Sequence, residues 1–184
     1  MTEKKELILE TALKLFAEHG FDTTPTSQIA KEAGVSEGLI FRHFTNKEGL
    51  MDAILAMSEE RMARHVKSIV ALGEPLAKIH ATIELPVKLF SEEREFWKLQ
   101  FSLKWQKKYR GQSYRPSGYY LELVEVITDA FRQLGYAEPE KEVLLLVMLL
   151  DGLSNQLMQQ PSEAFIEQTL SFLKSKYQQN KLKS

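Results

Sequence analysis

The chain has 184 residues, no cysteine and a formal net charge of −1 at pH 7. This length can hold one medium domain or a small domain joined to a larger one. The lack of cysteine excludes disulfides and thiolate catalysis, and it fits a reducing cytoplasm. The longest apolar run covers residues 143–150, far short of the roughly 20 residues that a membrane span needs. With no apolar signal core at the N-terminus, we expect a cytoplasmic protein with no membrane partner.

The first predicted helix covers about residues 3–19. Its apolar residues recur at helical spacing and form one stripe: Ile8, Ala12, Leu15 and Phe16. Gly20 ends this helix, and Phe21 is expected to fold back onto its last turn. Thr24 is expected to cap the next helix, with Pro25 at the first helical position.

Residues 26–47 predict a helix, a glycine-containing turn and a second helix, which is the arrangement that places a short helix in a DNA major groove. Gly34 stands where the turn needs a left-handed residue. Ile40 and Phe44, four residues apart, anchor the second helix from behind. The turn taken alone also suits a helical hairpin in any all-α domain.

Thr45 is expected to cap a fourth helix, which runs from residue 46 into the region 66–72. Helical periodicity then predicts five more helices, near residues 76–90, 92–109, 118–134, 138–159 and 162–177. Residues 111–117 form a long irregular connection, and Pro86 is expected to kink or break its helix. No strand alternation persists beyond a few residues. The predicted fold class is therefore all-α, with about nine helices.

The stretch from Ile8 to Leu55 resembles the TetR (TetR/AcrR) family of bacterial transcriptional regulators, over roughly the first quarter of the chain. The matching residues are Ile8, Ala12, Leu15, Phe16, Gly20, Phe21, Ile29, Ala30, residues 33–36, residues 41–44 and residues 46–50. The resemblance implies a three-helix helix-turn-helix domain over residues 1–46 that binds operator DNA. It also implies a helical domain over residues 47–184 that binds a small molecule and forms a homodimer.

The resemblance implies a role for each outward-facing residue of the DNA-reading unit. Phosphate contacts are expected at Thr26, His43 and Lys47. Base contacts are expected at Glu37, Gly38, Leu39 and Arg42. Two residues depart from the family pattern: Phe41 replaces the usual tyrosine and lacks its hydroxyl, and Leu39 can contact only a thymine methyl group.

Charge argues mildly against DNA binding. The first fifty residues hold six lysine or arginine residues against eight acidic ones, a net charge of −2. Phosphate binding requires local positive charge rather than a basic average, so we expect modest non-specific affinity.

Aromatic residues crowd positions 90–120. The residues that we single out as candidate effector contacts are Phe96, Trp97, Phe101, Trp105, Tyr119 and Tyr120. Their helical spacing also suits an ordinary core stripe. In the family this part of the chain lines the effector cavity, and aromatic walls suit a flat hydrophobic ligand or an organic cation.

The last two predicted helices carry more apolar surface than a monomer needs. The residues concerned are Leu145, Leu149, Leu153, Leu157, Phe165, Ile166, Leu170, Phe172 and Leu173. In the family such surface forms an intermolecular four-helix bundle. Asp151 and Asn155 share one face of the penultimate helix, where they either cap the dimer interface or place polar groups in the effector cavity.

The sequence thus predicts a repressor that binds a palindromic operator as a homodimer and is released by a small hydrophobic or aromatic effector. The alternative is an all-α small-molecule-binding or interaction protein with a vestigial helix-turn-helix, favoured by the acidic N-terminal balance and by Phe41. No enzyme, cofactor or metal is expected, because no phosphate loop, nucleophile elbow or paired-histidine helix occurs. His80 and Glu84 have the spacing of a metal-binding pair, but such isolated pairs are usually surface or helix-pairing residues.

Overall fold

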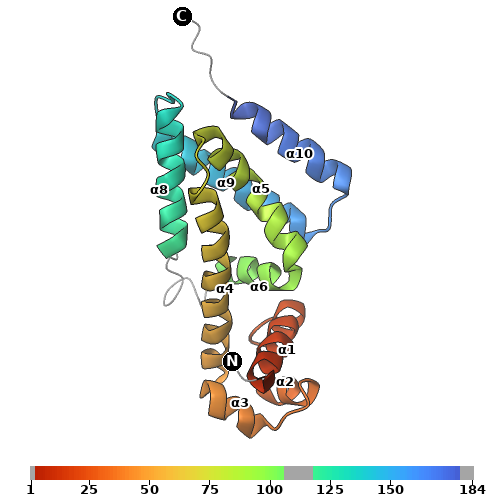
Figure 1. Cartoon of the computed structure of the whole chain (residues 1–184). Coiled ribbons are helices and arrows are strands. Elements are labelled where there is room, and N and C mark those ends of the chain that lie inside the picture. Colours follow the sequence, from red (N-terminus) through yellow and green to blue (C-terminus); the bar gives the residue numbers. More distant parts are fainter. Residues whose placement is uncertain (1–2, 106–117, 179–184) are drawn as a thin grey trace, which may run out of the picture. The chain divides into compact units, whose positions relative to one another are not determined.

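The computed structural model describes residues 3–105 and 118–178, and all regular structure within these two segments is helical (Figure 1). The helices are α1 (Glu3–His19), α2 (Thr26–Glu32), α3 (Glu37–Phe44), α4 (Lys47–Val70), α5 (Pro75–Glu92), α6 (Arg94–Trp105), α8 (Gly118–Gln133), α9 (Pro139–Met158) and α10 (Glu163–Lys176). The all-α prediction is confirmed. The irregular connection expected at residues 111–117 lies outside the described segments. No described helix is long and apolar enough to cross a membrane.

The chain forms two compact units. The first comprises Met1–Arg61 and Glu93–Tyr114, and the second comprises Met62–Glu92 and Arg115–Ser184. The expected domain boundary at residues 46/47 coincides with the start of α4, whereas these units divide inside that helix. The reason is that the first half of α4 buries Leu50, Met51 and Ile54 completely or nearly so.

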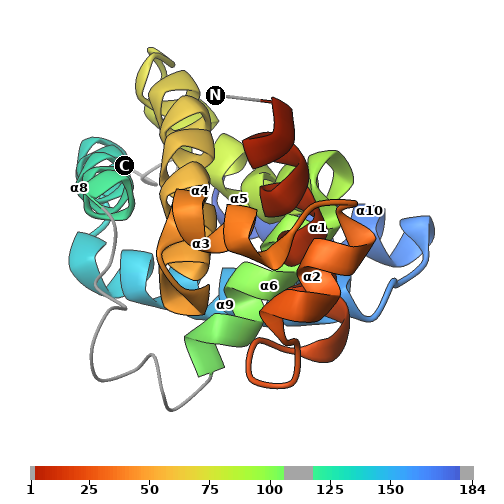
Figure 2. The same ribbon diagram turned by 90° about the horizontal axis from the view of Figure 1, so that it is seen from below.

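The first unit is built around α1. Helix α1 packs against α2 and α6, and α2 packs against α3 (Figure 2). The expected stripe of α1 is buried, and so is Leu9 beside it. Phe21 folds back as predicted, with its ring edge-to-face against that of Phe16 at 5.1 Å between centroids.

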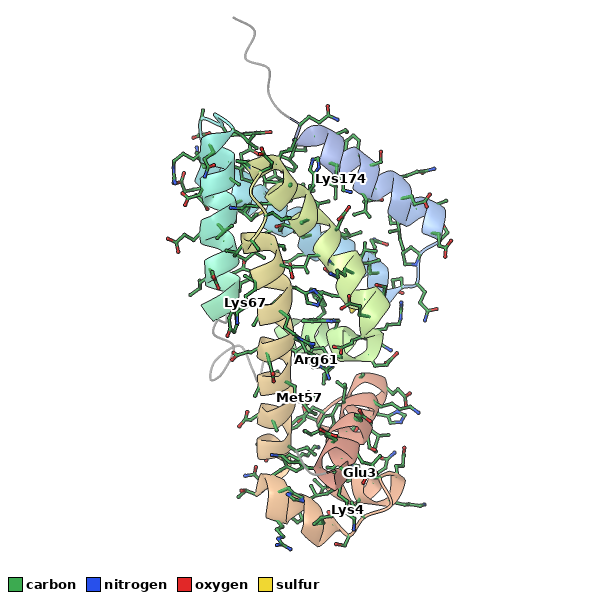
Figure 3. All side chains as sticks on the ribbon, in the orientation of Figure 1. Glu3, Lys4, Met57, Arg61, Lys67 and Lys174 are labelled. Carbon is green, nitrogen blue, oxygen red and sulfur yellow. The ribbon has the colours of Figure 1, made fainter. Side chains whose placement is uncertain are left out.

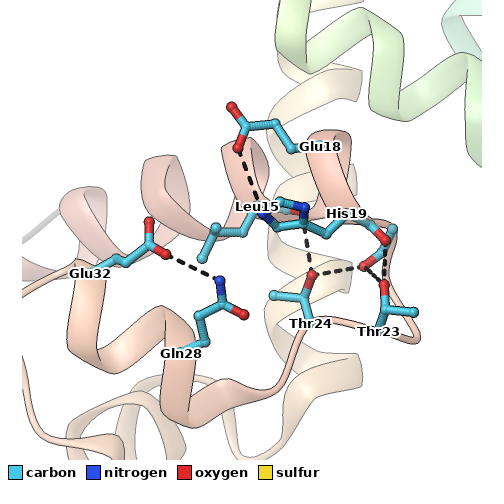
Figure 4. Close-up of polar contacts among 8 residues, drawn as sticks. Leu15, Glu18, His19, Thr23, Thr24, Gln28 and Glu32 are labelled. Atoms are coloured by element: carbon cyan, nitrogen blue, oxygen red, sulfur yellow. Dashed lines mark hydrogen bonds and ion pairs between the residues drawn. The ribbon is translucent and has the colours of Figure 1, made fainter.

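The starts of α2 and α4 differ from the predicted caps. Thr24 does not cap α2: its buried hydroxyl donates to the Gly20 carbonyl at 2.8 Å, with the Leu15 carbonyl at 3.3 Å (Figure 4). The threonine therefore closes the C-terminal end of α1, because the last carbonyls of a helix lack intrahelical donors. Pro25 precedes the first residue of α2 in extended conformation.

Helix α4 is capped by Asn46 rather than by Thr45. The Asn46 Oδ1 accepts a hydrogen bond from the Gly49 N–H at 2.7 Å, the arrangement of an N-cap side chain. Thr45 instead takes a positive φ of 66° in the tight turn between α3 and α4. A side chain at Gly49 is excluded here, because an added Cβ would lie 2.0 Å from the Phe44 carbonyl oxygen.

The second unit is built around α5, which packs against α8, α9 and α10. Helix α5 continues through Pro86, so the proline does not break it. His80 and Glu84 each contact the end of the chain's last described helix: His80 Nε2 lies 3.1 Å from the Tyr177 carbonyl, and Glu84 pairs with Lys174 (Figure 3).

Tyr177 ends α10 in a cluster of three aromatic rings. Its ring lies 5.3 Å from that of Phe131 and 6.5 Å from that of Tyr136, between centroids. The side chain is 1% exposed, and its hydroxyl has no hydrogen-bond partner among the described residues. Burial, and secondly the charge of Glu142, raise the pKa of the Tyr177 hydroxyl to about 12.

Candidate nucleic-acid interface

Helix α3 presents a buried face and an outer face. The turn before it is set by Gly34 at φ +63° and by a hydrogen bond of 2.9 Å from the Val35 N–H to the Ala30 carbonyl. Ile40 is 0% and Phe44 5% exposed, so these two residues fix the helix to the unit as predicted. The other face is available to a partner.

The outer face of α3 holds the residues predicted to read bases. Gly38 and Arg42 are exposed, and Glu37 and Leu39 are half-buried. A Cβ added to Gly38 would meet no atom within 4 Å. Packing within the protein therefore does not require glycine at this position, in contrast to Gly49. Phe41 lies on the outer side too, at 43% exposure, and is not part of the core.

Thr26 and Glu37 are joined directly. The Thr26 hydroxyl, at the first residue of α2, donates to Oε1 of Glu37, at the first residue of α3, over 2.5 Å. Both side chains are half-buried. The hydroxyl that the resemblance assigns to a DNA phosphate therefore has a charged acceptor within the protein.

Lys47 is held by the first unit rather than extended away from it. Its ammonium lies 4.6 Å from the centre of the Phe21 ring and 6.0 Å from that of Phe16. The Asp22 carbonyl also accepts a hydrogen bond from it at 3.4 Å. A cation over an aromatic face is attracted by the ring quadrupole, so this contact fixes the side chain at the start of α4.

His43, the third residue predicted to contact phosphate, is half-buried near the end of α3, with its ring 6.0 Å from that of Phe44. Lys5 of α1 lies 5.6 Å from the centre of the same Phe44 ring. Both side chains thus lie beside the aromatic residue that anchors α3.

The predicted effector residues divide between the two units. Phe96 and Trp97 of α6 are 1% and 5% exposed and pack edge-to-face at 4.9 Å between centroids. Arg61 lies over the Phe96 ring at 4.6 Å and donates to Glu93 at 2.6 Å (Figure 3). In the first unit these two rings are core residues, which is the interpretation that their spacing also allowed.

The other predicted effector aromatics whose side chains are described are less buried. Phe101 is half-buried in α6, and the Trp105 side chain lies outside what the structure describes. In the second unit, Tyr119 is half-buried and Tyr120 is 40% exposed, both in the first turn of α8.

On α9, Asp151 is half-buried and Asn155 is exposed. A shallow depression on α10 is lined by Glu167, Gln168, Ser171, Phe172 and Ser175, and none of the predicted effector residues takes part in it.

Sequence reasoning missed part of the exposed apolar surface of the second unit. Leu144 and Met148, one turn apart on α9, are 57% and 59% exposed, whereas Leu153 and Leu157 of the predicted set are buried within the unit. The signal was available in the unbroken run of residues 143–150, because eight consecutive apolar residues exceed what one buried helix face can hold.

The comparisons with known proteins agree with this geometry. The family model described as "Bacterial regulatory proteins, tetR family" matches residues 8–54, which span most of α1, all of α2 and α3, and the start of α4. Residues 8–54 belong to the TetR family.

Curated relatives match only part of the chain. It is 32% identical over 101 residues to the HTH-type transcriptional regulator YuxN of Bacillus subtilis, covering 54% of this chain and 35% of YuxN. It is 40% identical over 60 residues to the regulator AcrR of Shigella flexneri, covering 33% of this chain and 28% of AcrR. The matched region thus spans about a third of these relatives' length.

Solved structures match the chain over nearly its whole length. A TetR-like regulator from Rhodococcus sp. RHA1 has a TM-score of 0.78 at 17% identity, covering 94% of this chain and 92% of the other. A putative regulator from Saccharomonospora viridis, solved in complex with choline, has a TM-score of 0.73 at 21% identity, with 95% of each chain covered. At these identities the likeness establishes the fold.

Proposed function

We propose that this TetR-family protein is a transcriptional repressor that binds a palindromic operator as a homodimer and is released by a small-molecule effector. The observation that carries the proposal is the outer face of α3. Ile40 and Phe44 anchor the helix, while Gly38 and Arg42 stand exposed on its other side. A short helix that is anchored by its buried face and exposes its other face suits insertion into a major groove.

Each residue of this face has a definite recognition chemistry. Arg42 suits guanine, whose O6 and N7 accept two hydrogen bonds from a guanidinium group. Leu39 suits a thymine methyl group, and the missing side chain of Gly38 allows the helix backbone to approach the base edges. His43 and Lys47 remain the proposed phosphate contacts. Lys47 would contact a phosphate either from its place over the Phe21 ring or after its side chain moves away from that ring.

The exposed apolar residues of the second unit support dimerisation. Leu144, Leu145 and Met148 of α9 and Phe165 and Phe172 of α10 are all at least 40% exposed. Burying such a surface against a second copy is favourable by about 25 cal/mol per Å². A two-fold dimer then requires inverted half-sites about one or more helical turns apart.

We propose a small hydrophobic or aromatic effector, a class that includes organic cations held over ring faces. The support is the aromatic residues of α6, those at the start of α8 taken separately, and the choline complex of the Saccharomonospora viridis protein of the same fold. The effector would act by favouring a dimer whose two recognition helices no longer match successive major-groove faces.

Tryptophan emission tests the effector proposal. A compound that releases the protein from DNA should also change tryptophan emission, and replacing the tryptophan that responds by leucine should lower effector affinity while operator binding is retained. A library of hydrophobic compounds that changes neither emission nor DNA binding would count against an effector site beside the tryptophans.

Mobility shift on genomic fragments, at low and at physiological salt, tests the proposed function. We expect retarded complexes that survive physiological salt on a small set of fragments, because base contacts add affinity that salt does not remove. Equal loss of binding on all fragments would favour the second candidate, an effector-binding protein with a vestigial helix-turn-helix, which the acidic N-terminal charge balance supports.

A further inference from the structure

We infer that Glu37 reads an amino group on a base edge, that of cytosine, and that Thr26 positions this carboxylate instead of contacting a phosphate. The inference rests on the proposed function, since it concerns the same interface. It is carried by the hydrogen bond between the first residues of α2 and α3.

The geometry leaves one carboxylate oxygen open. Thr26 donates to Oε1 of Glu37 over 2.5 Å. Gln28, two residues further along α2, is engaged elsewhere, because its amide donates to Glu32 at 3.2 Å (Figure 4). Among the described hydrogen bonds, only that from Thr26 reaches the Glu37 carboxylate, so Oε2 keeps its capacity to accept from DNA.

A threonine hydroxyl has one proton to donate, and here it goes to a charged acceptor. Such bonds are roughly twice as strong as bonds between neutral groups. A DNA phosphate would have to replace the carboxylate as acceptor while lying next to its negative charge. The bond therefore favours Thr26 as the group that fixes the rotamer of Glu37, which removes conformational freedom before DNA binds.

The chemistry of a carboxylate selects the base. An ionised carboxylate only accepts hydrogen bonds, and the donors in the major groove are the amino groups of cytosine and adenine. The adenine amino group lies beside N7, an acceptor that repels a carboxylate, whereas the cytosine amino group is the recognised partner of glutamate. We therefore assign cytosine to the position that Glu37 contacts.

The same charge weakens binding to every other sequence. A carboxylate beside the phosphates releases no counterion and repels them. The first fifty residues of the chain, which include Glu37, already carry a net charge of −2. Glu37 thus raises the ratio of specific to non-specific affinity in two ways: it adds a contact on the cognate site, and it weakens binding to every other sequence.

The test begins with selection of bound duplexes from a random library, using the full-length protein. The selected site and its single-base-pair variants are then titrated with wild type, Glu37→Gln, Thr26→Val and Thr26→Ser, beside random DNA. Thermal melting of each variant accompanies the titrations, so that loss of folding is separated from loss of recognition.

We expect wild type to prefer cytosine by about tenfold or more at one symmetric position. Glu37→Gln should lose most of that preference and bind random DNA more tightly. Thr26→Val should weaken the same preference and leave random DNA unaffected. Thr26→Ser, which restores the hydroxyl, should recover the wild-type profile.

Two outcomes would overturn the inference while the function stands. If Thr26→Val weakens operator and random DNA equally with the cytosine preference intact, Thr26 contacts phosphate and does not position Glu37. If Glu37→Gln leaves every base preference unchanged, Glu37 reads no base. Selection that enriches no sequence with the wild-type protein would count against the proposed function itself, and the inference would fall with it.

Discussion

Phe41 allows the effect of a single hydroxyl to be tested at the proposed DNA interface. Its ring is 43% exposed on α3 beside Arg42, at the position where the family resemblance places a tyrosine that donates to a phosphate. Because the ring is not in the core, an added hydroxyl would reach solvent and would not be left buried without a partner.

We expect Phe41→Tyr to tighten DNA binding by about 0.5–1.5 kcal/mol, the net value of one hydrogen bond. The gain should be the same on operator and on random DNA, since phosphate contacts position the protein without specifying sequence. Fluorescence anisotropy titrations measure both affinities. Unchanged affinity with an unchanged melting temperature would show that α3 docks differently from the family pattern.

Lys47 has two roles that substitution can separate. Lys47→Ala removes the ammonium from the Phe21 ring and also the aliphatic stem, whereas Lys47→Met removes only the charge and keeps an apolar chain over the ring. We expect the alanine variant to unfold more easily than the methionine variant, and both to lose the cation–π contribution of about 0.5–1 kcal/mol.

If the ammonium also contacts a phosphate, both variants should bind all sequences more weakly and make the salt slope shallower by about one unit. Titration on random DNA at several salt concentrations measures this slope. A slope that neither variant changes would limit Lys47 to its contact with the aromatic rings.

At the scale of the element, the Tyr177 hydroxyl predicts how the end of α10 responds to pH. In the unfolded chain this hydroxyl ionises near its ordinary pKa of about 10. Burial raises its pKa in the folded protein to about 12, so the folded state holds the proton longer. The contribution of the neutral hydroxyl to folding stability is complete below pH 10, and it is lost as the pH rises from 10 to 12.

We expect Tyr177→Phe to be as stable as wild type or more stable at pH 8, because it removes a buried hydroxyl that has no partner in the described structure. Its advantage should widen above pH 10. Melting temperatures from pH 8 to 11 measure the difference, and Tyr119→Phe, a change at a half-buried tyrosine, is the matched control. A variant that melts lower at every pH would show that the hydroxyl has a partner in solution.

The elements themselves could be predicted closely from the sequence, and their ends and neighbours could not. Stripes such as that of α1 predict helices because one face must be apolar. The predicted cap at Thr24 was wrong. A threonine before a proline is typical of a helix start, but here its hydroxyl donates to a carbonyl at the end of the preceding helix. Phe96 and Trp97 could not be placed, since helical spacing does not show whether a ring faces core or cavity.

The candidate site, too, could be predicted only in part. The proposed recognition face could be predicted from the residue types of one continuous stretch, and Ile40 and Phe44 are buried as predicted. The bond between Thr26 and Glu37 joins residues eleven apart through a turn, and no local pattern indicates it. The grouping of α6 with the first unit depends on contacts with α1 that are distant in sequence.

At the scale of the whole molecule, Met148 tests the proposed homodimer. It is 59% exposed on α9, one turn from Leu144 at 57%. Met148→Glu would place a charge in the proposed interface, where it has no partner, and a buried unpaired charge costs several kcal/mol. We expect the variant to sediment as a monomer at micromolar concentration and to lose affinity for a palindromic site.

Met148→Leu, which keeps an apolar side chain of similar volume, should remain dimeric and serves as the control. Sedimentation velocity distinguishes the two variants. A Met148→Glu protein that stays dimeric would move the interface away from this face, and a wild-type monomer with specific DNA binding would remove the dimer from the proposal.

The contrast between Gly38 and Gly49 bears on how the recognition specificity of such a protein can change. A side chain at Gly49 collides with the Phe44 carbonyl, whereas a side chain at Gly38 meets nothing within 4 Å. The fold thus tolerates new residues at the proposed base-reading position and forbids them where two helices join. If Gly38 meets the bases as proposed, libraries varied at this position should yield new specificities among well-folded proteins.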